Sequence, residues 1–103
     1  GYLVSLDEIE TAARGFAGLT HVCDIGIEHP HHGESTTLCL LEQEKPLALP
    51  LRQWLAERLA RYKWPSFLLY LTEFPRTVTG KSDRKALERM AAEAARGGKL
   101  EAF

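Results

Sequence analysis

A proline near the middle of the chain forces one kind of secondary structure to end and another to begin. Trp64 precedes Pro65, and a residue before proline is disfavoured in the α conformation, so a helix must end there. Downstream, the apolar run 67–71 has the length of a buried strand. Upstream, apolar residues recur at helical spacings of three and four, namely Leu51, Leu55, Leu59 and Tyr62. The chain therefore alternates helix and strand over short distances.

The N-terminal segment has the features of a helix start. Ser5 can cap a helix, and Glu8 can complete a capping box with it. Apolar residues then follow one helical face as far as Phe16, and Gly18 is a suitable stop. We expect a helix from Ser5 to about Gly18.

Two further strands are expected at 22–27 and 36–41, and a loop of histidine, proline and glycine joins them. The helix that ends before Pro65 should begin near Pro50, because proline suits the first helical position. Short, hairpin-like links between helices and strands favour an α+β fold. We predict a small, mostly antiparallel sheet flanked by about three helices.

The third helix is expected after Ser82 or Asp83, since either residue can cap it. It should end at the glycine pair 97–98. Its apolar stripe comprises Leu87, Met90, Ala91 and Ala94. We therefore expect one domain over residues 1–96 and a flexible C-terminal tail over 97–103.

Composition excludes several classes of protein. A chain of 103 residues, 45% hydrophobic and 26% charged, suits one globular domain with a modest core. The net charge of −1 lacks the basic excess of a general nucleic-acid binder. No apolar run approaches the roughly 20 residues that span a bilayer, and no signal peptide is visible, so we expect a cytoplasmic protein. Glycine at position 1, in mid-pattern, indicates a piece of a longer polypeptide.

The cysteines and histidines have spacings that do not support a disulfide framework or a metal site. Cys23 and Cys39 are isolated, and two thiols in a non-secreted domain are expected to be reduced core residues. His29, His31 and His32 surround a proline without the spacing of zinc ligands. We expect an exposed polar turn there and no metal.

The strongest functional signal is the stretch 75–84, Pro-Arg-Thr-Val-Thr-Gly-Lys-Ser-Asp-Arg. Lys81 follows a turn glycine, Gly80, so its amine can reach an anion outside its own domain. A P-loop would need a second glycine at the position of Pro75, which has no N–H group to help cradle a phosphate. For Gly80 and Lys81 taken alone, an ordinary surface lysine is the simpler interpretation.

Three segments, in this order along the chain, resemble one known family. The stretch 75–84 is similar to the late motif of adenylate-forming enzymes, the acyl-CoA synthetase superfamily. Residues 1–10 and 59–65 (Leu-Ala-x-Tyr-Lys-x-Pro) resemble two other segments of that family's C-terminal lid domain. The resemblance covers nearly the whole chain. The chain departs from the family at Leu6, at Ser82 and in the histidine turn.

The resemblance implies roles for individual residues. Lys81 would be the lysine that reaches the active site during adenylation. Arg76 and Arg84 would orient its loop or pair with carboxylates of the partner domain, and both, with Gly80, would belong to the substrate- or cofactor-binding residues. Gly1 would line the channel that admits the thiol substrate.

The resemblance also implies a reaction and a partner. The parent enzyme would activate a carboxylic acid with ATP and Mg²⁺, and the lid would then rotate so that CoA can attack the acyl adenylate. A larger N-terminal adenylation domain of the same polypeptide would carry the nucleotide and acyl sites. We therefore expect part of an AMP-forming acyl- or aryl-CoA ligase, with the separate lid inactive and with no nucleic-acid partner.

Two alternatives stay open. In the first, the chain is the lid of a peptide-synthetase adenylation domain, which loads a carrier-protein thiol instead of CoA. In the second, it is a stand-alone interaction module that keeps the lid fold without its chemistry. The motifs do not separate CoA from a carrier protein, and they do not identify the acid.

Overall fold

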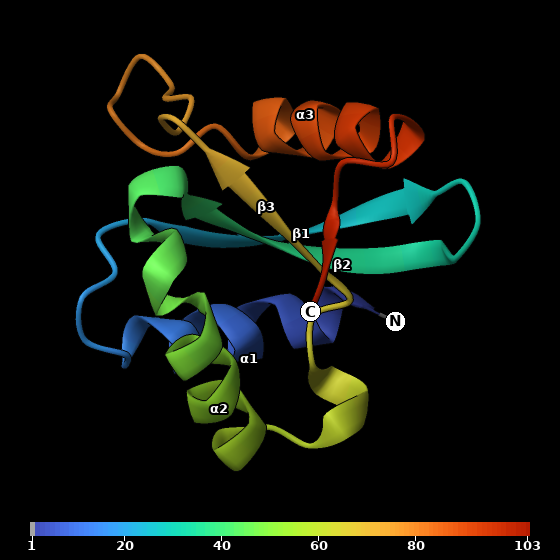
Figure 1. Cartoon of the computed structure of the whole chain (residues 1–103). Coiled ribbons are helices and arrows are strands. Elements are labelled where there is room, and N and C mark those ends of the chain that lie inside the picture. Colours follow the sequence, from blue (N-terminus) through green and yellow to red (C-terminus); the bar gives the residue numbers. More distant parts are fainter. Residues whose placement is uncertain (1) are drawn as a thin grey trace.

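The fold is described by a computed structural model, which covers residues 2–103 and the side chains from residue 6 onward. As far as residue 96, α-helices and strands follow one another in the order that the sequence predicts (Figure 1). In chain order the elements are α1 (Tyr2–Arg14), β1 (Val22–His29), β2 (Gly33–Leu41), the 3₁₀-helix η1 (Glu42–Leu47), α2 (Ala48–Arg58), the 3₁₀-helix η2 (Arg61–Lys63), β3 (Phe67–Leu71), α3 (Arg84–Arg96) and β4 (Glu101–Ala102).

The strands form one sheet in the order β1-β2-β3-β4. β1 pairs with β2 in antiparallel fashion, as β3 does with β4, whereas β2 and β3 are parallel. A parallel pair needs a crossover connection, which is provided here by η1, α2 and η2. The fold is therefore α+β with a small, mostly antiparallel sheet and three α-helices, which confirms the predicted class.

Helices cover both faces of the sheet. α1 and α2 lie on one face and α3 lies on the other (Figure 1). Because side chains alternate along a strand, Leu38 and Leu40 of β2 pack toward α1 and α2, while Cys39 and Leu41 pack toward α3. Both faces of β2 are buried, which explains its nearly continuous apolar sequence.

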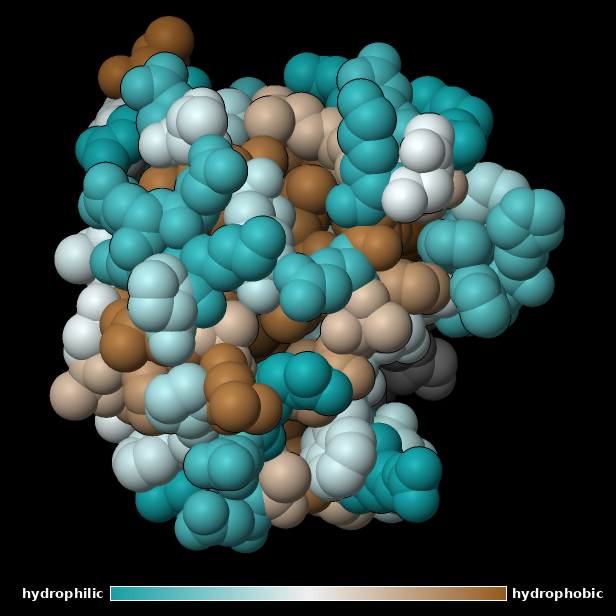
Figure 2. Space-filling model, viewed as in Figure 1, coloured by the Kyte–Doolittle hydropathy of each residue, from teal (hydrophilic) through white to brown (hydrophobic). Residues whose placement is uncertain are grey.

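Exposed apolar side chains come from different elements. Leu49 lies on α2, Tyr62 on η2, Val78 in the loop after β3, and Met90 on α3. In Figure 2 the hydrophobic areas of the visible face are interrupted by hydrophilic residues. Among the described residues, no helix combines the length and the hydrophobicity that crossing a membrane requires.

Three expectations about helix ends are wrong. The first helix, α1, begins at Tyr2, three residues before the start that the sequence predicts at Ser5. Pro50 is the third residue of α2, where its missing N–H costs nothing because the first four N–H groups of a helix have no partner within it. Tyr62 is 84% exposed, since the helix ends at Arg58 and η2 carries Tyr62 away from the apolar face.

The C-terminal segment differs from the flexible tail that the sequence predicts over 97–103. Glu101–Ala102 form β4 and extend the sheet beside β3. The N–H of Phe103 donates to the carbonyl of Ser66 at 3.1 Å, and Phe103 packs against the core beneath α2. Gly98, with φ +68°, lets the chain turn back after α3. The tail is therefore paired with the domain instead of leaving it.

The two cysteines are structural. Cys23 and Cys39 are register partners on β1 and β2, and both are buried and free. Burial, and then the Glu10 carboxylate, raise the pKa of Cys23 to about 12, and burial raises the pKa of Cys39 well above its usual value. The prediction of reduced core thiols is confirmed, and both thiols stay protonated at neutral pH.

Candidate functional site

Lys81 lies in a short hairpin that leaves the sheet after β3 (Figure 1, orange loop beside α3). The N–H of Thr77 donates to the carbonyl of Lys81 at 2.8 Å, and the N–H of Gly80 donates to the carbonyl of Thr77 at 2.9 Å. Gly80 has φ +87°, a left-handed conformation that glycine adopts without strain. The turn ends at this glycine and leaves the next residue, Lys81, exposed.

Polar contacts close the base of the hairpin. The N–H of Asp83 donates to the carbonyl of Pro75 at 2.9 Å, and Arg76 and Ser82 form an antiparallel bridge. The Asp83 carboxylate accepts a hydrogen bond from the N–H of Ala86 at 3.1 Å, so Asp83 caps α3, one of the two caps that the sequence predicts. The hairpin and α3 therefore share one anchored junction.

Arg84, the first residue of α3, turns its guanidinium back onto its own domain. Its Nη2 lies 2.6 Å from Oε2 of Glu10 in α1, and its Nη1 donates to the carbonyl of Asp24 in β1 at 3.0 Å. Oε2 of Glu10 also accepts the N–H of Asp24 at 2.9 Å, while Oε1 pairs with Arg14 at 2.7 Å. Arg84 is therefore bonded within the chain, beside the base of the hairpin.

The acids of this cluster are deeply buried. Glu10 is only 2% exposed, and both carboxyl oxygens of the buried Asp24 lack a hydrogen-bond partner among the described residues. Burial, and then the neighbouring Glu10 carboxylate, raise the pKa of Asp24 to about 9. Burial, the largest single effect, lowers the pKa of Arg84, but the hydrogen bond to Glu10 and the nearby acidic groups together raise it overall. The ion pairs here are therefore between Glu10 and its arginines, and Asp24 is neutral at neutral pH.

The remaining predicted site residues lie elsewhere. Nη2 of Arg76 lies 3.1 Å from Nε2 of His21, and the Arg76 side chain is exposed. Gly1 lies outside the part of the chain that the structure describes. The structure thus places Arg76 and Lys81 in one hairpin and ties Arg84 to the helix and strand beneath it.

The histidine turn between β1 and β2 has a structural explanation. The N–H groups of His31 and His32 lie 3.0 and 3.3 Å from Nδ1 of His29, and the His29 ring stacks on Phe67 with centroids 4.8 Å apart. His31 and His32 are exposed, as the prediction of a polar turn requires. Across the described residues, no group of three His, Cys, Asp or Glu side chains gathers to hold a metal ion.

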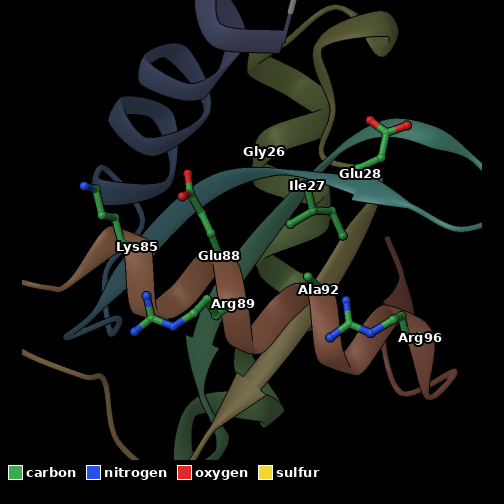
Figure 3. A pocket seen from close by; sticks show the side chains of 8 residues that line it. All are labelled: Gly26, Ile27, Glu28, Lys85, Glu88, Arg89, Ala92 and Arg96. Atoms are coloured by element: carbon green, nitrogen blue, oxygen red, sulfur yellow. The ribbon is translucent and has the colours of Figure 1, made fainter.

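A hollow of about 550 Å³ lies between the free edge of β1 and α3 (Figure 3). Gly26 and Ala92 leave the space because their side chains are small. The other lining residues carry charges of both signs or are apolar: Ile27, Glu28, Lys85, Glu88, Arg89 and Arg96. Such mixed charge favours no single class of ligand, so the hairpin remains the better candidate site.

Sequence reasoning missed Glu10 and the backbone of Asp24 as partners of Arg84. A signal was present, because Asp24 interrupts an apolar strand pattern and Glu10 adjoins the apolar stripe of α1. A charged carboxylate at such a position is buried only if it has partners, as Glu10 has, whereas the Asp24 carboxyl is buried without a partner among the described residues, in its neutral form. The sequence could not identify the partners of Glu10, because Asp24 and Arg84 lie 14 and 74 residues from it along the chain.

Comparisons with known proteins identify the fold and family. The family model described as the AMP-binding enzyme C-terminal domain matches residues 8–81. The chain is 34% identical over 87 residues to gramicidin S synthase 2 of Brevibacillus brevis, covering 84% of this chain and 2% of that protein. It is 35% identical over 91 residues to a mitochondrial malonate–CoA ligase of Homo sapiens, covering 86% of this chain and 16% of that protein.

Solved structures agree with these sequence matches. A Mycobacterium tuberculosis fatty acyl CoA synthetase superimposes with a TM-score of 0.73 at 27% identity, covering 84% of this chain and 18% of that one. ATP-bound MatB from Rhodopseudomonas palustris has the same fold, with a TM-score of 0.71 at 22% identity, over 86% of this chain and 18% of that one. The chain thus spans a small part of each relative's length. The hairpin, the α+β sheet and these matches together show that the chain belongs to the family of AMP-binding enzyme C-terminal domains, within the adenylate-forming superfamily.

Proposed function

We propose that the chain is the lid of an AMP-forming ligase and that Lys81 supplies a positive charge to the adenylation site on a larger N-terminal domain. The observation that carries this proposal is an exposed lysine in a hairpin whose base is bonded on two sides. Such an arrangement presents an ammonium group to a neighbouring domain while the lid itself stays rigid. Arg76 and Gly80 support the same hairpin, through the bridge to Ser82 and through the turn.

The chemistry accounts for a lysine at this place. When a carboxylate attacks the α-phosphate of ATP, two anions approach each other and pyrophosphate leaves. A preorganised cation offsets their repulsion and stabilises the charge that develops on the oxygens. Lysine is suited to this role because its ammonium is a compact point charge on a long, flexible stem. The thiols of this chain are protonated and buried, and they take no part.

The remaining components belong to the partner domain. ATP, Mg²⁺ and the carboxylic acid would be held there, as the resemblance to adenylate-forming enzymes implies. The separate lid is therefore expected to be inactive. In the second half of the reaction the lid rotates, withdraws Lys81 and admits the thiol, with Gly1 near the thiol channel.

The nature of the thiol is the second part of the proposal. We propose CoA as the thiol, a choice supported by the similarity of this chain to a malonate–CoA ligase and to a fatty acyl CoA synthetase. A carrier-protein thiol is the alternative, favoured by the similarity to gramicidin S synthase 2. Supplying the full-length enzyme with CoA or with a pantetheinylated carrier protein would separate the two.

The test of Lys81 uses the full-length ligase that contains this chain. The acid substrate is the one that gives the fastest ATP–pyrophosphate exchange in a panel of malonate, octanoate, benzoate and amino acids. Lys81→Ala should slow pyrophosphate exchange by about 10²–10³-fold, the usual cost of one preorganised charge contact. Thioester formation from pre-made acyl adenylate should persist.

The matched control is Lys85→Ala, which removes an exposed lysine from α3 outside the hairpin. This variant should exchange pyrophosphate at nearly the parental rate. Equal loss of both half-reactions in Lys81→Ala would contradict the role given to Lys81.

A further inference from the structure

Glu10, Arg84 and the backbone of Asp24 form a bonded unit, here named the edge clamp, beside the base of the Lys81 hairpin. We infer that Glu10 is a positioning residue for Lys81 and acts through Arg84 and the Asp24 backbone. The inference rests on the proposed function of Lys81. It assigns a role in adenylation to a buried carboxylate that touches none of the reactants.

The edge clamp replaces a missing neighbour of β1. β1 is an edge strand, and the N–H and C=O of a residue on such an edge point outward without a strand to bond. Glu10 accepts the N–H of Asp24 at 2.9 Å and Arg84 donates to the C=O of Asp24 at 3.0 Å. The Glu10–Arg84 contact of 2.6 Å closes the ring of bonds. Helix α1, the edge of β1 and the start of α3 are thereby fastened at one point.

That point controls the hairpin because of its place in the chain. Arg84 begins α3 and follows Lys81 by three residues, a stretch that spans at most roughly 10 Å. Between them, Asp83 is bonded both to Pro75 across the hairpin and to Ala86 in α3. The direction in which the hairpin leaves the domain is therefore set where Arg84 is held. The tip has no comparable support, since Val78 and Lys81 are exposed.

Glu10 offers a matched pair of arginines for a test. Arg84 binds Oε2 and leads to the hairpin, whereas Arg14 binds Oε1 and is four residues away on the same helix. Removing either cation weakens the pairing of one buried carboxylate. Only the loss of Arg84 releases the junction with the hairpin, so the two variants separate positioning from general stability.

The experiment measures both half-reactions of the full-length ligase in Arg84→Met and Arg14→Met. Arg84→Met should slow pyrophosphate exchange by about 10–100-fold, since a misplacement of about 1 Å at a reacting centre can cost that much. Thioester formation from pre-made adenylate should change by less than about twofold, and Arg14→Met should leave both steps near parental rates. Arg84→Lys, which keeps one charged contact, should restore part of the exchange rate.

A double-mutant cycle shows whether the clamp acts through Lys81. In a Lys81→Ala background, Arg84→Met and Glu10→Gln should cause almost no additional loss, because the group that they position is already absent. Fully additive losses would overturn the inference, as would equal losses in the two half-reactions or equal effects of the two arginine variants. Thermal unfolding checks that each variant is folded, and Glu10→Gln carries the same test if Arg84→Met does not fold.

Failure of this inference differs from failure of the proposed function. If Lys81→Ala itself leaves pyrophosphate exchange intact, the proposed function of the hairpin is wrong. If Lys81→Ala blocks exchange while Arg84→Met and Glu10→Gln do not, the lysine keeps its role and only the edge clamp is refuted.

Discussion

The tip and the base of the Lys81 hairpin are built in opposite ways. At the tip, Val78 is fully exposed, and the turn is held by bonds within the hairpin, Gly80 to Thr77 and Thr77 to Lys81. At the base, a carboxylate that is 2% exposed binds two arginines and a backbone N–H. Under the proposed function, the Lys81 charge enters a cleft of another domain, so the tip must be free of its own domain while the base must hold it in place. The two requirements are met a few residues apart.

The largest effect on stability is expected at the base. Arg84→Met should lower the free energy of unfolding of the chain by about 2–3 kcal/mol, because the Glu10 carboxylate loses one partner while remaining buried. The value lies below that of a fully buried pair, since Arg84 is about half exposed and Arg14 remains bound. Urea denaturation followed by circular dichroism gives the measurement.

Lys63→Met is the matched control for that variant. It also removes a cation from a glutamate of α1, Glu8, but this pair is accessible to solvent. The loss should be clearly smaller than in Arg84→Met, because solvent screens an accessible ion pair. Equal losses in the two variants would show that the buried pair gives no special support to the base.

A pH-dependent effect comes next, from Asp24. Its pKa in the folded chain is about 9, against an ordinary value of 3.8, so between these values the unfolded state releases a proton that the folded state keeps. The free energy of unfolding should therefore fall as pH rises through this window, by about 1 kcal/mol per pH unit, and level off above about pH 9.

Asp24→Asn should remove that slope, because an amide does not ionise. Urea denaturation at pH 6 and pH 8 gives the free energy of unfolding of variant and parent. The difference, variant minus parent, should rise by about 2 kcal/mol from pH 6 to pH 8. Asp7→Asn, which changes an exposed acid of α1, is the control and should keep the parental slope. A parental slope in Asp24→Asn would show that another group titrates.

The smallest effect is expected at the tip. Gly80→Ala places a side chain on a residue with φ +87°, which should cost about 1 kcal/mol and slow pyrophosphate exchange less than Arg84→Met does. Among the described residues, no atom beyond Gly80 and its two chain neighbours lies within 4 Å of the added Cβ, so the cost is conformational rather than steric.

Gly97→Ala serves as the comparison, because Gly97 has φ −87° and its added Cβ would make only ordinary contacts. It should change stability by less than about 0.5 kcal/mol. If both glycine variants behaved alike, the turn would not depend on a left-handed residue, and the tip would be less constrained than its geometry indicates.

Most of the secondary structure was predictable because it depends on neighbours in the chain. The run 67–71 coincides with β3, and the strand after the histidine turn was correct to within a few residues. The predictions were wrong where contacts with distant parts of the chain overrode the preference of the local sequence. Tyr62 continues a helical spacing but is exposed, because the chain leaves the helix early to cross over to β3. Residues 97–103 have little local preference, and a vacant edge of β3 makes part of them a strand.

For the candidate site, the spacing of one short stretch was enough to place a glycine turn, a lysine directly after it and a helix cap. Each of these depends on bonds between residues only a few positions apart, such as Asp83 with Ala86. The contacts that hold this stretch against the rest of the domain could not be predicted from the spacing of its residues. Arg84 is 74 residues from Glu10 and 60 from Asp24, and a charged side chain gives no sign of which distant carboxylate or carbonyl it will bind. That choice follows from how α1, β1 and α3 pack around the sheet, because only burial makes such a partner necessary.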